Sequence, residues 1–215
     1  MNDKKDKVSE KKTCAPLWGT LLFFILIAID QLTKLLADVY FTATGAPSSV
    51  ALVDGWLWLR ITYNRGISYG LGANASPTLK IVVIAITAVM MLGLIVWYFL
   101  LKPDRRLMRI AIVFVAAGGV GNLIDRVYYR VWDPATYPLG VRDMVDLSRF
   151  GFAVCNFADF FITFGVIMLV LALLFFDKDA AFPIGKYKKL AQQAEAAQEA
   201  QEEVTEITEK EETNG

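Results

Sequence analysis

Four long apolar runs constrain this chain more than any other feature of its sequence. They cover about residues 17–37, 78–101, 107–125 and 152–176. Each run is close to the roughly 20 residues that an α-helix needs to cross the hydrocarbon core of a bilayer. Within lipid each run must be helical, because the backbone has to satisfy its own hydrogen bonds there. The sequence therefore predicts an all-α membrane protein built on a four-transmembrane-helix bundle.

Composition agrees with this prediction and removes several classes of chemistry. Of the 215 residues 55% are hydrophobic, and the mean hydropathy is +0.43, more apolar than a typical soluble domain. The chain has no histidine, which excludes Ser-His-Asp and Cys-His catalytic sites and any His-ligated metal. Its two cysteines, Cys14 and Cys155, lie far apart and predict neither a disulfide framework nor a zinc site. We expect no metal, no cofactor and no nucleic-acid partner.

The distribution of Lys and Arg predicts the orientation of the spans. Positive residues cluster in three short segments: Lys4, Lys5, Lys7, Lys11 and Lys12; Lys102, Arg105, Arg106 and Arg109; and Lys178, Lys186, Lys188 and Lys189. Short cytoplasmic flanks carry an excess of such residues. The three segments, and hence both termini, are therefore expected in the cytoplasm. The first run has no clear cleavage site, so we interpret it as a retained span after a basic tail, 1–16.

The two longer connections, about 38–77 and 126–151, are expected to face outward. Within the first, "SSVALV", Asp54-Gly55 and "WLWLRITYN" are typical of a β-hairpin with alternating side chains. We expect a small β-hairpin or sheet on the outer leaflet, and the second connection as an extracytoplasmic loop. The charged segment 178–215 is expected to be helical or disordered, without a catalytic role.

Polar residues converge at the outer ends of three of the predicted spans. They are Asp30 and Lys34 in the first span, Asn122, Asp125 and Arg126 in the third, and Asn156 and Asp159 in the fourth. Ionisable groups inside spans are costly and usually mark function. Internal pairing can neutralise Asp30, Lys34, Asp125 and Arg126, whereas Asp159 has no cation within one helical turn. Asp159 is therefore the strongest candidate for a functional carboxylate.

A natural partner for Asp159 is a second carboxylate. Two carboxyl groups that share a proton separate their pKa values, so that one acts as a base and the other as an acid. Such a pair can activate water for attack on an amide. The candidates are Asp125, Asp143 and Asp146, and spacing alone does not choose among them. Asp143 is expected to cap or solvate the loop, whereas the apolar neighbours of Asp146 suit a chain that re-enters the interface.

Five motifs at the ends of the predicted spans resemble those of lipoprotein signal peptidase, or signal peptidase II. They are "DQLTK", "NRGISYG", "GGVGNLIDR", "MVDL" and "CNFAD", in that order over about residues 25–177. The resemblance implies an aspartic endopeptidase of the bacterial cytoplasmic membrane. Members of this family remove the signal peptide of prolipoproteins just before a diacylglyceryl-modified cysteine, so membrane lipid and lipid-modified prolipoproteins are the expected partners.

The resemblance also implies roles for individual residues. The catalytic V-D-F and N-x-A-D motifs of the family match Asp146 in "MVDL" and Asp159 in "NFAD", with Leu147 in place of the usual Phe and Cys155 as a second departure. Supporting and substrate-binding positions map to Asp30, Lys34, Asn64, Gly66, Gly118, Asn122, Asp125, Arg126, Asn156 and Ala158.

Three other functions are compatible with parts of the sequence. A small proton-coupled transporter would need polar groups across the whole bilayer, but the charges stop at one depth. An assembly factor held together by polar residues would leave no unpaired acidic couple. Nucleophilic catalysis by Cys155 lacks a histidine, and a Ser68–Lys34 pair would compete with the neutralisation of Lys34 by Asp30.

Overall fold

The computed structural model describes residues 15–66, 71–177 and 179–213, and within them it confirms a helical bundle with a small sheet. The elements are α1 (Ala15–Thr42), β1 (Val50–Val53), β2 (Leu57–Asn64), α2 (Pro77–Leu100), α3 (Arg106–Tyr128), β3 (Val141–Asp146), a 3-10 turn η2 (Ser148–Phe150), β4 (Val154–Cys155), α4 (Phe157–Leu174) and α5 (Lys186–Thr213). The first four long helices, α1 to α4, are long and apolar enough to cross a membrane. The basic residues predicted at 1–12 and Lys178 lie outside the described residues.

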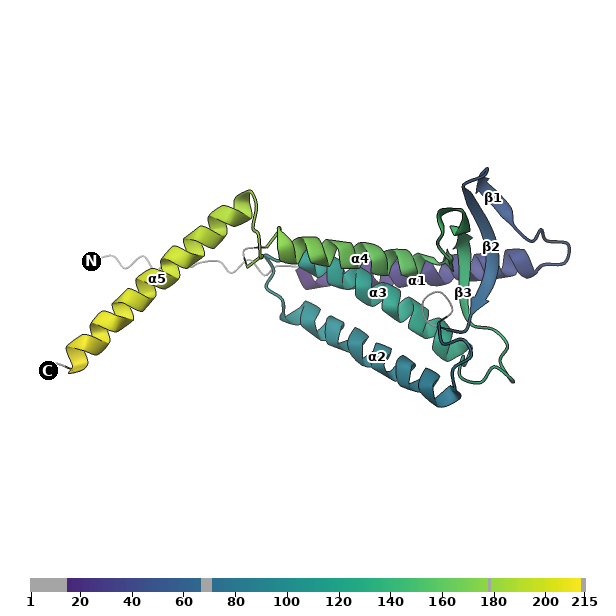
Figure 1. The fold of residues 1–215 in the computed structure, drawn as a ribbon, viewed down its shortest axis with the longest axis horizontal. Coiled ribbons are helices and arrows are strands. Elements are labelled where there is room, and N and C mark those ends of the chain that lie inside the picture. Colours follow the sequence, from purple (N-terminus) through teal and green to yellow (C-terminus); the bar gives the residue numbers. More distant parts are fainter. Residues whose placement is uncertain (1–14, 67–70, 178, 214–215) are drawn as a thin grey trace, which may run out of the picture.

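Helix α3 is the centre of the bundle. In the most apolar 18-residue stretch of α3, 61% is buried inside the protein, against 11–22% for the other three candidate spans. The exposed apolar side chains of those three helices suit contact with lipid. Figure 1 shows α1, α2 and α4 arranged around α3. Small residues allow close approach: Ala117 is fully buried, and Gly118 lies against the backbone carbonyl oxygen of Ala158 on α4. The central helix thus carries its polar residues into the protein interior.

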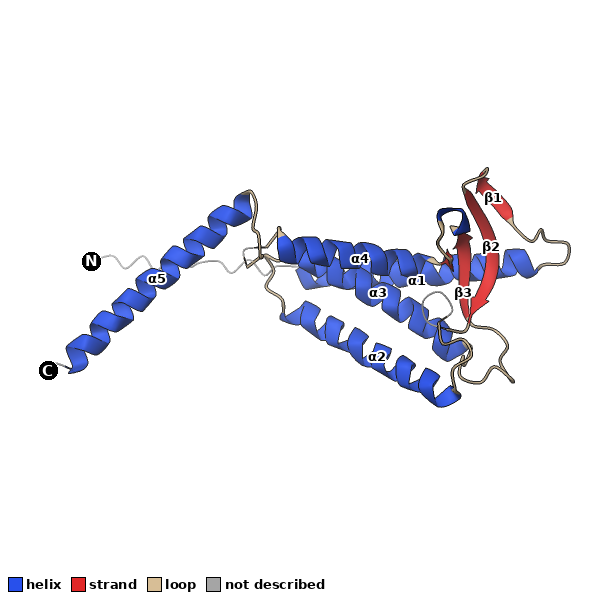
Figure 2. Ribbon diagram, in the orientation of Figure 1, coloured by secondary structure: helices blue, strands red, loops and turns tan. Residues whose placement is uncertain are grey.

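A four-stranded antiparallel sheet in the order β1-β2-β3-β4 covers one end of the bundle, which we call the sheet end (Figure 2). The predicted hairpin is present, with Val50 opposite Leu59. The second connection supplies β3, and β4 lies where the fourth span was predicted to begin; neither was predicted as a strand. Strand β3 pairs with β2, with Thr62 opposite Asp143 and Trp58 opposite Asp146. The sheet therefore brings the second connection over the ends of α1, α3 and α4.

Two predicted helix boundaries differ from the structure by five residues, and the others by one to three. Helix α1 continues to Thr42, and α4 begins at Phe157 rather than 152. The later start has a local cause, because Asn156 and Asp159 form a reciprocal capping box. The Asn156 side chain accepts from the amide of Asp159 at 3.2 Å, and the Asp159 carboxylate accepts from the amide of Asn156 at 3.0 Å. Asp159 thus lies in the first turn of α4, at the sheet end.

Candidate active site

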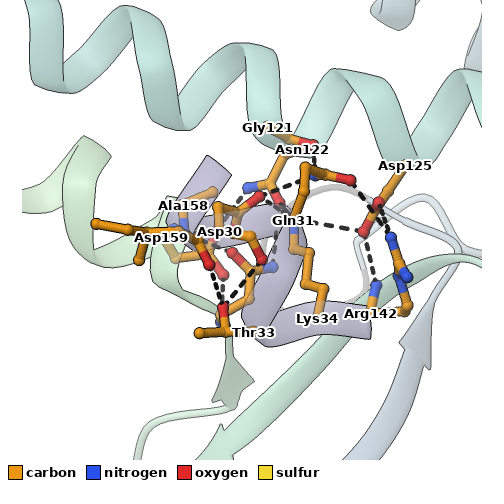
Figure 3. A network of polar contacts seen from close by, with 12 residues as sticks. Asp30, Gln31, Thr33, Lys34, Gly121, Asn122, Asp125, Arg142, Ala158 and Asp159 are labelled. Atoms are coloured by element: carbon orange, nitrogen blue, oxygen red, sulfur yellow. Dashed lines mark hydrogen bonds and ion pairs between the residues drawn. The ribbon is translucent and has the colours of Figure 1, made fainter. Parts of the chain in front are cut away.

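Lys34 is the centre of a fully buried ion cluster between α1 and α3. Its ammonium group lies 2.8 Å from Asp30 and 3.3 Å from Asp125, and all three side chains have 0% exposure. It also donates to the Asn122 side-chain oxygen at 3.1 Å. Burying one member of such a cluster without its partners would cost several kcal/mol, so the charges hold the helices in one register. Figure 3 shows these side chains meeting between the helices.

Asp125 receives a second cation from the sheet. Arg142 on β3 donates from its guanidinium to one oxygen of Asp125 at 2.9 Å and from its backbone amide to the other at 3.1 Å (Figure 3). This two-point contact fixes β3 to the end of α3. The predicted pairing of Asp30 with Lys34 is confirmed. Asp125 was expected to pair with Arg126 or with a donor from another strand, and it pairs with Lys34 and with Arg142 of β3. The Arg126 side chain makes no hydrogen bond or ion pair within the described part of the chain.

Besides its ion pair with Lys34, Asp30 also binds the start of α4. Its other carboxylate oxygen accepts from the backbone amide of Ala158 at 2.9 Å, and Ala158 has 0% exposure. The amides in the first turn of a helix have no partner within the helix, so this bond satisfies one of them. Asp159 follows Ala158 directly. The first span therefore positions the carboxylate in the fourth.

Two asparagines surround the carboxylate of Asp159. The Asn122 side-chain amide donates to it at 2.8 Å, and the backbone amide of Asn156 donates to its second oxygen at 3.0 Å. The Asn156 side chain donates to Asn122 at 3.0 Å and to Asp143 at 2.6 Å. Asn156 therefore contacts both Asp159 and Asp143.

Asp143 is the second buried carboxylate of the site. It is 4% exposed and also bonds the side chain of Asn64, which in turn accepts from the amide of Gly66 at 2.9 Å. Burial and the nearby charge of Asp159 raise the pKa of Asp143 to about 7, against the opposing effect of bonds from Asn156 and Asn64. Two close carboxyl groups with separated pKa values can act as an acid and a base.

Asp146 lies away from this pair, and the predicted placement of the two β3 aspartates needs correction. The carboxylate of Asp146 forms an ion pair with Arg60 at 3.0 Å and accepts from the amide of Ser148 at 2.9 Å. Burial alone would raise the pKa of Asp146, but the hydroxyl and amide of Ser148, with Arg60, hold it below its usual value. Asp146 thus has the local capping role that was expected of Asp143.

The pleat of β3 explains this exchange. Successive side chains of a strand point to opposite faces, so residues three positions apart face opposite ways. Asp143 and Asp146 are such a pair, and only one can point toward the helices. Recognising 141–146 as a strand would have exposed the conflict, but its charged residues obscured the apolar alternation.

Cys155 has surroundings that do not suit a nucleophile. It lies on β4, with its sulfur 3.6 Å from the carbonyl oxygen of Val145. Burial, followed by the charges of Asp159, Asp143 and Asp146, raises the pKa of Cys155 to about 12. The thiol therefore stays protonated near neutral pH. Only the thiolate is reactive, so Cys155 does not suit nucleophilic catalysis.

An apolar groove lies at the sheet end of the bundle. It has a volume of about 910 Å³ and lies between the end of α1, the sheet and the start of α4. Its walls include Leu36, Tyr40, Leu59, Met144, Phe157 and Phe160. Phe157 and Phe160 belong to the first turn of α4, which also carries Asp159, whereas Met144 points to the face of β3 opposite Asp143.

Similarity to known proteins agrees with this arrangement. Residues 22–175 match the family model described as signal peptidase (SPase) II. A lipoprotein signal peptidase from Fusobacterium nucleatum subsp. nucleatum is 33% identical over 73% of this chain and 86% of its own length. A second, from Moorella thermoacetica, is 32% identical over 72% and 91%.

The fold has a solved counterpart. A bacterial membrane enzyme of known structure superposes with a TM-score of 0.58 and 26% identity, covering 73% of this chain and 87% of its own. The match of sequence and fold, together with four helices long and apolar enough to cross a membrane, makes this chain a multi-pass membrane peptidase. It belongs to the signal peptidase II family.

Proposed function

We propose that the protein is an aspartic endopeptidase that cuts diacylglyceryl-modified prolipoproteins just before the modified cysteine, with Asp143 and Asp159 as its catalytic pair. One observation carries the assignment: Asn156 binds both carboxylates, and the charge of Asp159 helps to raise the pKa of Asp143. Asp143 takes the place that the resemblance assigned to Asp146, because the carboxylate of Asp146 is bound by Arg60 and by the amide of Ser148.

The proposed chemistry uses one ionised and one protonated carboxyl group. Asp159, held by Asn122 and Asn156, takes a proton from water while that water attacks the carbonyl carbon of the scissile amide. Asp143 gives its proton to the carbonyl oxygen, forming a tetrahedral intermediate. The intermediate then collapses: the carbon–nitrogen bond breaks as the leaving nitrogen takes the proton held by Asp159, and one hydroxyl of the intermediate returns a proton to Asp143. The products are a carboxylic acid and an amine.

Substrate contacts follow from the surroundings of the pair. The apolar groove suits the acyl chains or the hydrophobic signal segment of a prolipoprotein, since apolar surface gains by leaving water. Arg126 lies within electrostatic reach of Asp159 and Asp143, and its unbonded guanidinium can donate to a substrate carbonyl. Asp30, Lys34, Asp125 and Asn64 are proposed as supporting residues, and Gly66, Gly118 and Ala158 as positions of close packing.

The proposed location is the bacterial cytoplasmic membrane, with both termini in the cytoplasm and the sheet end at the outer leaflet. The support is the clustering of Lys and Arg at the opposite end, in the α2–α3 connection and at the start of α5. Exposed Trp56 and Trp58 on the sheet suit the headgroup region.

A cleavage assay with matched substrates tests this function. We expect the purified protein to cut a diacylglyceryl-modified prolipoprotein at the bond before the cysteine, as read from product masses. The same prolipoprotein without the lipid should be cut far more slowly. Equal cleavage of both substrates, or a product that begins at another residue, would contradict the proposed specificity.

A further inference from the structure

The start of α2 and the end of α3 lie at the sheet end (Figure 1). A second cavity is lined by residues of these two helix ends. Its volume is about 280 Å³. Leu79, Val83 and Val131 contribute apolar walls, and Arg65, Lys80 and Arg126 contribute three positive charges. No acidic side chain is among its described lining residues. We call this cavity the cationic pocket.

Lys80 is the least expected member of the pocket. It is 7% exposed, and its ammonium group donates to the carbonyl oxygen of Val131 at 3.2 Å. No carboxylate lies within ion-pair distance of it in the described part of the chain. Lys80 also occupies the first turn of α2, where the helix dipole is positive and disfavours a cation. A buried cation in this position is stabilised by an anion.

The two arginines have donors to spare. Arg65 directs its Nε and Nη2 to the carbonyl oxygen of Pro138, which leaves the other guanidinium hydrogens available. The Arg126 guanidinium makes no hydrogen bond or ion pair with the described residues, although it lies within electrostatic reach of Asp159, Asp143 and Asp125. Three cations and a helix start, with no acidic side chain among the described lining residues, favour an anion with several acceptor oxygens.

We propose that the cationic pocket binds a phosphate group, carried either by an anionic phospholipid or by a free phosphate compound. Phosphate offers the oxygens that two guanidinium groups and an ammonium group can share. The apolar wall continues to Leu79, which is 53% exposed on a helix that faces lipid. The pocket therefore suits the headgroup and glycerol of a phospholipid whose chains remain in the membrane. It is separate from the apolar groove and shares only Arg126 with the proposed substrate contacts, so the test below rests on Lys80, which has no part in the proposed cleavage chemistry.

Lipid binding by the full-length protein tests this proposal. The protein is purified in a neutral detergent, and bound lipid is measured by native mass spectrometry with phosphatidylglycerol and phosphatidylcholine of identical chains. We expect phosphatidylglycerol to bind about tenfold more tightly, the difference that one charge-assisted hydrogen bond provides. Lys80→Met should remove this preference. Lys80→Arg should keep it, as should the control Lys102→Gln, which removes an exposed lysine from the other end of α2.

Soluble ligands distinguish the two sources of phosphate. Inorganic phosphate and glycerol 3-phosphate, added without lipid, should raise the melting temperature of the wild type but not of Lys80→Met if a free phosphate is the ligand. Equal binding of both lipids, with no effect of soluble phosphate, would overturn the proposal. A preference that survives in Lys80→Met would overturn it too. Cleavage in detergent without phospholipid should be unchanged in Lys80→Met, which separates this test from that of the peptidase.

Discussion

At the scale of single residues, Asn156 connects the two halves of the proposed catalytic pair. Its side-chain amide donates to Asp143 at 2.6 Å, while its backbone amide donates to Asp159 at 3.0 Å. One residue thereby sets the relative position of the two carboxylates. The charge of Asp159 also helps to raise the pKa of Asp143.

The raised pKa of Asp143 predicts a pH limit on cleavage. Asp143 must be protonated to act as an acid, and its pKa in the folded protein is about 7. We expect kcat/KM to fall above that pH by about tenfold per unit, as the acid loses its proton. The Asp146→Asn variant should show the same fall in kcat/KM above this pH. A profile that stays flat to about pH 9 would contradict the role of Asp143 as the acid.

Folding stability should change in the same pH window. The pKa of Asp143 in the folded protein lies above its ordinary value, so folding favours the protonated carboxyl group. The contribution of this group to the free energy of unfolding is therefore greatest below about pH 4 and is lost as the pH rises through about 7.

Residue-scale features could be predicted only where the partners lie close in sequence. Asp30 and Lys34 are four positions apart on one helix, and their ion pair follows from that spacing. Arg142 reaches Asp125 across a strand and a helix end, and no local pattern signals this contact. Lys80 is the only charged residue in the second apolar run, which marks it as unusual in the sequence. Its contact with the carbonyl oxygen of Val131, however, comes from tertiary structure and cannot be predicted locally.

At the scale of elements, the contact between α3 and α4 positions Asp159. A Cβ atom on Gly118 would collide with the carbonyl oxygen of Ala158 and lie 2.8 Å from the Ile162 side chain. A second contact involves Gly165, whose Cβ would lie 2.8 Å from the amide nitrogen of Val115. The backbones of the two helices therefore touch directly, and glycine is the residue that permits it.

Gly118→Ala tests this contact. The added methyl group must push α4 away, although Ala158 is held by Asp30, so we expect destabilisation of about 1–3 kcal/mol together with reduced cleavage. Gly93→Ala is the matched control, because nothing lies within 4 Å of the position of its Cβ. Thermal unfolding in one detergent compares the two variants. Equal melting temperatures would show that the helices do not need this approach.

The helices could be predicted better than the strands. Runs of about 20 apolar residues identify spans without reference to the rest of the chain. Strands β3 and β4 are short, and they are stabilised by pairing with β2 and with each other. Their existence therefore depends on partners distant in sequence, as does the face on which Asp143 lies.

At the scale of the whole molecule, the polar site occupies one end of the bundle and α5 extends from the other (Figure 1). The family model ends at residue 175, before α5 begins at Lys186. The proposed organisation is a four-span peptidase domain over about 17–177, flanked by two charged tails. Nothing in the described contacts links α5 to the sheet end.

Removal of α5 tests this division. A chain that ends at Gly185 should keep the wild-type rate of cleavage in detergent, because the proposed pair and the apolar groove lie at the opposite end. The contact between the rings of Phe176 and Tyr187 is lost, with a small effect on stability. A truncated protein that folds normally but cleaves much more slowly would assign α5 a part in the activity.

The most direct test of the account compares three aspartates in one cleavage assay. Asp143→Asn, Asp159→Asn and Asp146→Asn each replace a carboxylate by an amide of similar size, and thermal unfolding confirms the fold of each variant. We predict that the first two lose cleavage by about 10³-fold or more, and that Asp146→Asn stays within about tenfold of wild type. A folded Asp143→Asn variant that still cleaves, with Asp146→Asn inactive, would contradict the pair proposed here.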